Sequence, residues 1–135
     1  MPSLKTLSRE TLERAIFFDV EKRISDTHPA ICGVLCEGQF ETFVLDPHLE
    51  PAAAYSDLPF QDAHEFMGSL IALAEEEDRW LIAYSNHEKD LLSEMFPEDF
   101  PTIEKQYCNG NCTRWFKTNF PDEFQAAYDA EKKKG

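Results

Sequence analysis

Two carboxylate residues, Asp19 and Glu21, stand two positions apart in a short apolar run. The run, residues 15–21 (AIFFDVE), is rich in aromatic and branched residues, and this composition predicts a buried strand. Side chains two apart on a strand share a face, so Asp19 and Glu21 are expected to project together. Unpaired buried charge is costly and like charges repel, but a magnesium or manganese ion between the two would remove both penalties. The alternative is that the strand ends at Phe18 and both acids face solvent.

The segments on either side of this pair predict the elements that would hold it. The first is a short helix within residues 1–14, capped by Ser8 and packing Leu12 inward. Two further strands, at 30–36 and 40–45, are separated by a Glu-Gly-Gln turn signal. Strands joined by tight turns form an antiparallel meander, so we expect the first three strands to pair in chain order.

The middle of the chain alternates helix and strand. Asp62 precedes Glu65 by three residues, which predicts a capped helix whose apolar residues recur at helical spacing to Ala74. A short apolar strand at 80–84 follows this helix and is expected to join the sheet in parallel. Two more helices are predicted, at 85–96 and 121–133. The fold class is therefore α/β, with a three-stranded antiparallel meander and a parallel fourth strand flanked by helices.

Length and composition limit the class of protein. The 135 residues suffice for one domain with a core, and 42% hydrophobic with 29% charged residues is typical of a globular chain. No apolar run reaches membrane-spanning length and the N-terminus lacks the pattern of a signal peptide, which predicts no membrane partner and a cytoplasmic location. The formal net charge of −13 argues against a broad electrostatic grip on nucleic acid. It leaves room for a local basic strip, whose candidates are Lys105, Arg114 and Lys117 and the C-terminal lysines 132–134.

Four cysteines raise a further metal-binding alternative. Cys32 and Cys36 lie well apart on one face of the second predicted strand and are interpreted as small buried hydrophobic residues. Cys108 and Cys112 lie in a stretch rich in Asn and Gly, so a zinc site that uses them with ligands from elsewhere stays open. Disulfides are not expected in a cytoplasmic protein.

The order of predicted elements resembles the ribonuclease H-like fold, in which a three-stranded meander is followed by a helix, a strand and a helix. Residues 17–21 (FFDVE) resemble the first motif of the DEDD 3′–5′ exonuclease superfamily, an apolar strand that carries Asp-x-Glu. Residues 84–92 (YSNHEKDLL) resemble the second motif, and the form with Glu at this point is similar to the predicted RecB-like and YprB-like ribonuclease H-like nucleases. The resemblance covers roughly residues 14–96.

This resemblance implies two-metal hydrolysis of phosphodiester bonds, in which two Mg²⁺ or Mn²⁺ ions activate a water and stabilise the leaving oxygen. Asp19 would bridge both ions, Glu21 would bind one, and Glu88 or, failing that, Asp90 would supply the acid of the second motif. Glu88 ranks first because two leucines follow where the family has apolar residues. The alternative for Glu88 is the return half of a capping box with Ser85, and for Asp90 an exposed helix acid.

The third motif of the family has no clear match. The family places an Asp on a late helix with a His or Tyr as general base, and the late candidate here is Asp129, with Phe124 at the His position and Tyr128 directly adjacent. Asp129 is interpreted as a surface acid that matches by chance, although it remains a candidate ligand. Two functions follow: a metal-dependent, 3′–5′ exonuclease-like nuclease acting on DNA or RNA, or a catalytically degenerate domain of the same fold that serves as a protein-interaction module.

Aromatic and basic residues gather late in the chain. Trp115, Phe116 and Phe120 could stack the bases of a single-stranded nucleic acid, with Arg114 and Lys117 beside its phosphates. The alternative is that these aromatic residues close a core, which is the more common role of such residues.

Overall fold

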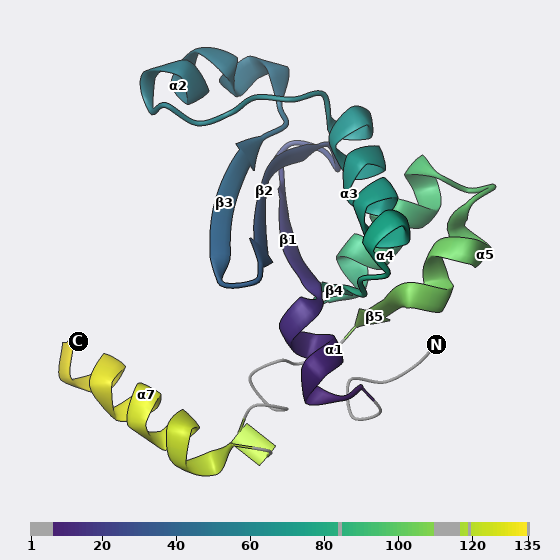
Figure 1. The fold of residues 1–135 in the computed structure, drawn as a ribbon. Helices are drawn as coiled ribbons and strands as arrows, with labels where there is room; N and C mark the ends of the chain where they lie inside the picture. Colours follow the sequence, from purple (N-terminus) through teal and green to yellow (C-terminus); the bar gives the residue numbers. More distant parts are fainter. Residues whose placement is uncertain (1–6, 84, 110–116, 119, 135) are drawn as a thin grey trace.

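Five strands form one mixed sheet in the computed structural model, which describes residues 7–83, 85–109, 117–118 and 120–134. The strand order is β3-β2-β1-β4-β5, so β1 lies at the centre of the sheet (Figure 1). The strands are β1 (Ile16–Lys22), β2 (Pro29–Cys36), β3 (Gln39–Val44), β4 (Leu81–Ala83) and β5 (Tyr107–Asn109).

The directions of the strands confirm the predicted meander and the parallel fourth strand. β1 pairs with β2 and β2 with β3 in antiparallel, whereas β4 runs parallel to β1. Between β2 and β3, Glu37 and Gly38 have φ values of 50° and 80°, as in the two-residue hairpin turns whose twist suits paired strands. The parallel strand β5 was not predicted, because three residues are too few to show a period; it is held by pairing with β4.

Helices α3, α4 and α5 lie together on one side of the sheet (Figure 1). α3 begins at the predicted cap, where the Asp62 carboxylate accepts a hydrogen bond from the backbone N–H of Glu65. Among the described residues, no helix is both long and apolar enough to cross a membrane. The helices are α1 (Arg9–Arg14), α2 (Glu50–Tyr55), α3 (Ala63–Glu77), α4 (Asn86–Met95), α5 (Phe100–Ile103) and α7 (Pro121–Lys134), with 3-10 turns η2 (Pro47–Leu49) and η3 (Glu104–Gln106).

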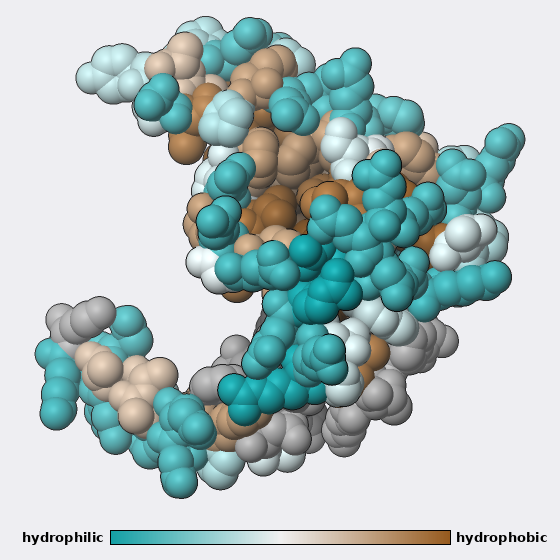
Figure 2. Space-filling view, in the orientation of Figure 1, coloured by the Kyte–Doolittle hydropathy of each residue, from teal (hydrophilic) through white to brown (hydrophobic). Residues whose placement is uncertain are grey.

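The main core lies between the sheet and these helices. Ile16, Phe18 and Val20 alternate along β1, are at most 3% exposed, and belong to one buried cluster with Met67 of α3 and Leu92 of α4. Burial of each such side chain contributes about 1.5–3 kcal/mol. Figure 2 shows apolar surface between β3 and α3, at the margin of this core. One face of β1 is therefore fixed by packing.

A smaller cluster lies on the other face of the sheet, beside β4 and β5. Ser8 caps α1 and Leu12 is buried, as predicted. Leu12 packs in one buried cluster with Ile82 of β4 and Cys108 of β5, and Phe17 lies against it. Helix α1 thus covers the β4–β5 part of this second face.

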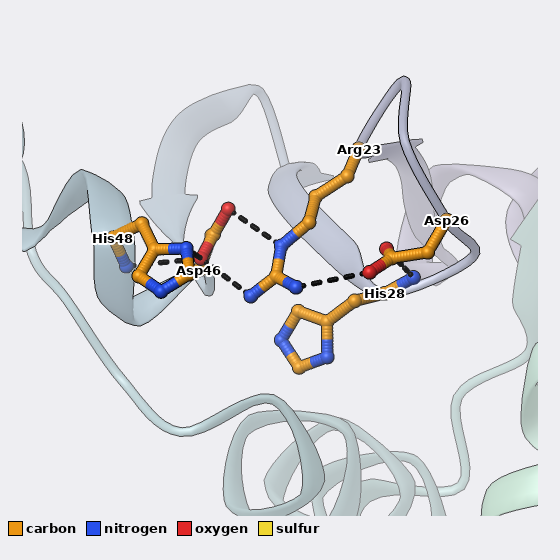
Figure 3. Close-up of polar contacts among 5 residues, drawn as sticks. All are labelled: Arg23, Asp26, His28, Asp46 and His48. Atoms are coloured by element: carbon orange, nitrogen blue, oxygen red, sulfur yellow. Dashed lines mark hydrogen bonds and ion pairs between the residues drawn. The ribbon is translucent and has the colours of Figure 1, made fainter.

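A network of charged side chains ties the end of β1 to the segment after β3 (Figure 3). The Arg23 guanidinium donates to both carboxylate oxygens of Asp46 at 2.8 Å and to Asp26 at 3.1 Å. Asp46 is 4% exposed and also accepts from the backbone N–H of His48, at the start of η2. Such a two-pronged Arg–carboxylate contact fixes geometry as well as adding energy, so it sets where the β1–β2 connection lies.

The exchange Asp46→Asn tests this network through its dependence on pH. Its hydrogen bonds with Arg23 lower the pKa of the Asp46 carboxyl to about 2, against about 3.9 in an unfolded chain. A group with a lower pKa in the folded state adds stability that is complete above about pH 4 and is lost as the pH falls towards about 2. In urea unfolding we expect the variant to be less stable than wild type at pH 7, with the difference shrinking below about pH 4.

The matched control is Asp26→Asn, which removes the more exposed of the two contacts with Arg23. It should destabilise the protein less than Asp46→Asn, because exposed ion pairs contribute little. A stability difference for Asp46→Asn that stays constant from neutral to acid pH would contradict this account of the network.

Candidate functional site

Asp19 and Glu21 share the face of β1 that the helices α3 and α4 do not cover. Both are exposed, while Phe18 and Val20 beside them are buried. The strand does not end at Phe18: β1 continues to Lys22, and Asp19 pairs with Gly33 of β2. The acids therefore lie on a central strand, as the first interpretation of the sequence expected, and they face solvent, as the alternative expected.

Glu88 is brought from 68 residues away to the middle of β1. It is 1% exposed, and its Oε1 accepts from the backbone N–H of Val20, the residue between Asp19 and Glu21, at 3.5 Å. Its Oε2 accepts from the Ser85 hydroxyl at 2.8 Å, and that hydroxyl caps α4 by accepting from the backbone N–H of His87. The predicted pairing of Ser85 with Glu88 is present, but it is made between the side chains.

Both carboxylate oxygens of Glu88 are thus used inside the protein. Among the described residues, no three His, Cys, Asp or Glu side chains form a group that could hold a metal ion. A two-metal centre needs several carboxylates around a shared point. The donor set as arranged here does not fit two ions held by Asp19, Glu21 and Glu88.

Two buried groups near Glu88, the Cys32 thiol and the Tyr107 hydroxyl, have raised pKa values, so both stay protonated at neutral pH. The pKa of the Cys32 thiol is raised to about 12, chiefly by burial and to a lesser extent by the charges of Asp19 and Glu88, against a hydrogen bond with the Asp19 backbone that lowers it. Burial likewise raises the pKa of the Tyr107 hydroxyl, and the negative charge of Glu88 is the second largest cause of this rise. Because the thiolate is the reactive form of cysteine, Cys32 is a core residue here, as its sequence context predicted.

The other residues suggested by sequence do not gather at this point. Asp90 is exposed and lines a polar cavity of about 320 Å³ beside the start of α4, together with Lys22 and His87. Asp129 is exposed on α7, where its carboxylate accepts from the side-chain amide of Gln125 at 3.0 Å.

The suggested nucleic-acid contacts lie late in the chain. Lys117 stands 5.9 Å from the centre of the Phe124 ring. Arg114 and Trp115 lie outside the described residues, as does Cys112, so the stacking platform and the zinc alternative both stay predictions. Cys108, the other half of that alternative, is buried in β5.

An exposed apolar surface on the sheet was not anticipated from the sequence. Phe40 of β3 is 65% exposed and Leu35 of β2 is 39% exposed, and they pair across the two strands. With Phe17, Asp19 and Gly33 they line a shallow hollow of about 310 Å³. We refer to these five residues as the open face.

The lack of a side chain at Gly33 shapes the open face. A Cβ on Gly33 would stand 3.0 Å from the ring of Phe40, so that ring lies directly over the backbone of β2. Glycine inside a strand often marks such a close approach. The sequence held one sign of this exposed apolar surface. Polar and apolar residues alternate imperfectly along β3, so that Phe40 and Phe43 fall on opposite faces of the sheet.

Comparisons with protein-family models, with curated proteins and with solved structures found no match for this chain.

Exchanges at Glu88 separate a structural acid from a catalytic one. Glu88→Gln keeps the shape and an oxygen acceptor for Val20, so we expect the free energy of unfolding to change little. Glu88→Ala leaves the Val20 N–H and the Ser85 hydroxyl without their partner, which should cost about 1–3 kcal/mol. Chemical denaturation of both variants is the measurement. Equal loss of stability in the two would contradict a role based on hydrogen bonding.

Proposed function

We propose that this chain is a ribonuclease H-like domain that acts as a protein-interaction module, with the open face of its sheet as the binding surface. Support for the fold comes from the sheet itself. The antiparallel meander β1–β3, the helix α3, the parallel strand β4 beside β1 and the helix α4 follow the layout expected of that fold. The acids of the first strand lie on its central member, as the resemblance requires.

The open face is the observation that carries the proposal. Large aromatic and aliphatic side chains rarely remain exposed together on a sheet unless something covers them. Phe40 and Leu35 lie side by side, with Phe17 beside them on the central strand. Apolar side chains at the centre and charged ones at the rim are the usual anatomy of a protein interface, and Asp19 and Glu21 supply such charges here.

The chemistry beside the open face favours binding over catalysis. The acid that would complete the metal centre, Glu88, is buried and serves α4 and β1 instead. A nucleic acid would meet the exposed carboxylates of Asp19 and Glu21 and the overall charge of −13. Polypeptide is therefore the class of partner that this surface suits better.

A photo-crosslinking side chain in place of Phe40 tests this assignment. Residue 40 is 65% exposed, so the exchange should leave the fold intact. We expect irradiation to give covalent products with polypeptide, and few or none with a single-stranded oligonucleotide supplied with manganese. The same side chain in place of Tyr55 is the control, because Tyr55 is 94% exposed on α2 and is not part of the open face.

Products that form equally from positions 40 and 55 would show non-specific contact and defeat the proposal. Efficient crosslinking from position 40 to the oligonucleotide would favour the second candidate instead.

The second candidate function is a metal-dependent nuclease of the 3′–5′ exonuclease type. Two features favour it: Asp19 and Glu21 lie exposed on the same face of the central strand, and Glu88 contacts the backbone between them. In this candidate Mg²⁺ or Mn²⁺ would be held by Asp19 and Glu21, and the buried Glu88 would have to exchange its internal hydrogen bonds for the ion.

Manganese titration with a fluorescent single-stranded oligonucleotide tests the nuclease. The interaction module predicts no stepwise shortening, and no rise in melting temperature on addition of manganese to wild type or to Asp19→Asn. Glu123→Gln, an exposed acid of α7 remote in sequence from β1, is a matched control for the loss of one charge. Shortening by wild type that Asp19→Asn abolishes and Glu123→Gln retains would establish the nuclease and overturn the module.

A further inference from the structure

One side of the β3 backbone faces away from the rest of the sheet, because β3 is the outermost strand at its margin (Figure 1). Two hydrogen bonds at its end show which residues face which way. The N–H of Leu45 donates to a carbonyl of β2 at 2.8 Å, whereas the N–H of Val44 donates away from β2, to the segment 59–61, at 2.9 Å. Backbone groups alternate in direction along a strand. Thr42 and Phe40 therefore also direct their N–H and C=O groups outwards.

The chain itself occupies the last of these outward positions. Val44 forms a parallel bridge with Phe60, in which the Val44 carbonyl accepts from the N–H of Gln61 at 3.0 Å. Among the described residues, the outward N–H and C=O groups of Phe40 and Thr42 form no hydrogen bond. We call these outward groups of Phe40 and Thr42 the free edge. Unpaired backbone groups in a row are a template for a further strand, and the bridge at Phe60 shows that this margin accepts an extended segment.

The side chains along the free edge point to the two sides of the sheet. Phe40 and Thr42 lie on the side of the open face, where Phe40 is 65% exposed. Glu41, between them, lies on the other side, opposite Val34 of β2, which packs against the main core. Glu41 is exposed, and its carboxylate has no ion pair or hydrogen bond with any described residue. The free edge thus offers two backbone pairing sites with an unpaired acid between them.

We propose that the free edge binds an extended, basic segment of a partner polypeptide, which adds to the sheet as a further strand beside β3. The proposal rests on the proposed function and specifies the backbone conformation and the charge of the polypeptide that the module binds. In peptide recognition by strand addition, backbone hydrogen bonds supply affinity and neighbouring side chains supply specificity.

The pattern of backbone groups suits a polypeptide. On an added antiparallel strand, one residue pairs with Phe40 through both its N–H and its C=O, and the residue two positions earlier pairs with Thr42 in the same way. An extended polypeptide repeats a donor and an acceptor at this spacing of about 6.8 Å. A phosphodiester backbone offers acceptors without donors, so it would leave the outward carbonyls unpaired.

The charge beside the free edge selects a basic segment. The peptide residue between the two pairs lies opposite Glu41, with their Cβ atoms about 4.5–5.5 Å apart, so the two side chains interact. Lys or Arg at this position pairs with an acid that has no other partner, and the net charge of −13 attracts a basic segment from a distance. The residues opposite Thr42 and Phe40 lie on the side of the open face, where β-branched and aromatic side chains pack well.

The same charge argues against a second copy of β3 as the added strand. A two-fold pairing that uses all the outward groups of both free edges places Phe40 opposite Thr42 and brings the Glu41 residues of the two copies face to face. Like charges directly opposite are destabilising, and charges on edge strands keep sheets from pairing with themselves. A shift of the register would bring Phe40 to Val44, whose outward groups the segment 59–61 already uses. A partner of opposite charge avoids both obstacles.

Amide hydrogen exchange, followed by NMR on the full chain, is the first measurement, because it distinguishes outward from inward groups. In the free protein the N–H groups of Phe40 and Thr42 should exchange quickly, and those of Glu41 and Phe43, which face β2, slowly. The probe is the peptide acetyl-Ser-Thr-Val-Lys-Phe-Thr-Ser-amide, whose Val, Lys and Phe lie opposite Thr42, Glu41 and Phe40. Saturating peptide should slow exchange at Phe40 and Thr42 roughly tenfold or more, and change it far less at Glu41 and Phe43.

Methylated peptides separate strand addition from other contacts. N-methylation of the Phe amide of the probe removes the donor that faces the Phe40 carbonyl and leaves every side chain in place. The dissociation constant from NMR titration should then rise roughly tenfold. N-methylation of the Lys amide is the matched control, because this group points away from β3, and this peptide should bind as the parent does.

Reversal of charge tests the role of Glu41. Glu41→Lys should raise the dissociation constant of the probe roughly fivefold, and a probe with Glu in place of Lys should recover binding to this variant. Glu98→Lys makes the same change of charge at an exposed acid between α4 and α5 and should bind the original probe as wild type does. Both exchanged residues are exposed, and unchanged circular dichroism verifies that the variants fold.

Four outcomes would overturn the proposal: slow exchange at Phe40 and Thr42 in the free monomer, no protection of these amides by the probe, equal binding of the two methylated peptides, or a dimer whose formation protects both amides. If residue 40 crosslinks to polypeptide but no strand adds at the free edge, this proposal fails and the interaction module stands. Absence of both crosslinks and protection would defeat both.

Discussion

The arrangement depends on one buried group that links segments far apart in the chain, the carboxylate of Glu88, which accepts a long hydrogen bond of 3.5 Å from the Val20 backbone. It joins the start of α4 to the central strand just beyond the end of β4, and the Ser85 hydroxyl completes it. A buried carboxylate persists only when its oxygens are hydrogen-bonded. Because this acid is used to hold α4 on β1, it is not presented to solvent with Asp19 and Glu21.

A second constraint is the unequal cover of the two sides of the sheet. Among the described residues, three helices pack on the side of Ile16, Phe18 and Val20, whereas the other side carries α1 alone, beside β4 and β5. The meander half of that side therefore exposes Phe40 and Leu35. The same asymmetry explains how two acids sit on a central strand, since their face is open to water.

Local signals predicted the helices α1, α3, α4 and α7 and the directions of the strands β1 to β4, whereas α5 was not predicted. Asp62 and Ser85 were identified as caps because a cap and its partner lie within three residues of each other. The turn before β3 was also predicted from neighbouring residues, because Glu37 and Gly38 are adjacent in the sequence and form the turn. Whether the acids of β1 face solvent was left open, because this depends on which side of the sheet the later helices cover.

The features of the site that were missed are all non-local. The resemblance placed Glu88 near Asp19 and Glu21, but its hydrogen bond with the Val20 backbone, 68 residues away, was not predicted. The strand β5 forms only because β4 offers a free edge to Tyr107. The open face needs residues of three strands in one register, with Phe40 lying over Gly33, and the sequence showed it only as a weak alternation in β3.

The role of Glu88 is the central claim, and titration with magnesium followed by NMR tests it most directly, because this diamagnetic ion shifts the carboxyl signals of its ligands without broadening their neighbours. Carboxyl signals of labelled Asp and Glu side chains are followed as the ion is added in small steps. The account predicts that the Glu88 signal stays in place while exposed acids across the surface shift weakly and together. Saturable shifts of Asp19, Glu21 and Glu88 together at the first equivalents of magnesium, ahead of all other acids, would contradict it and show a shared metal site.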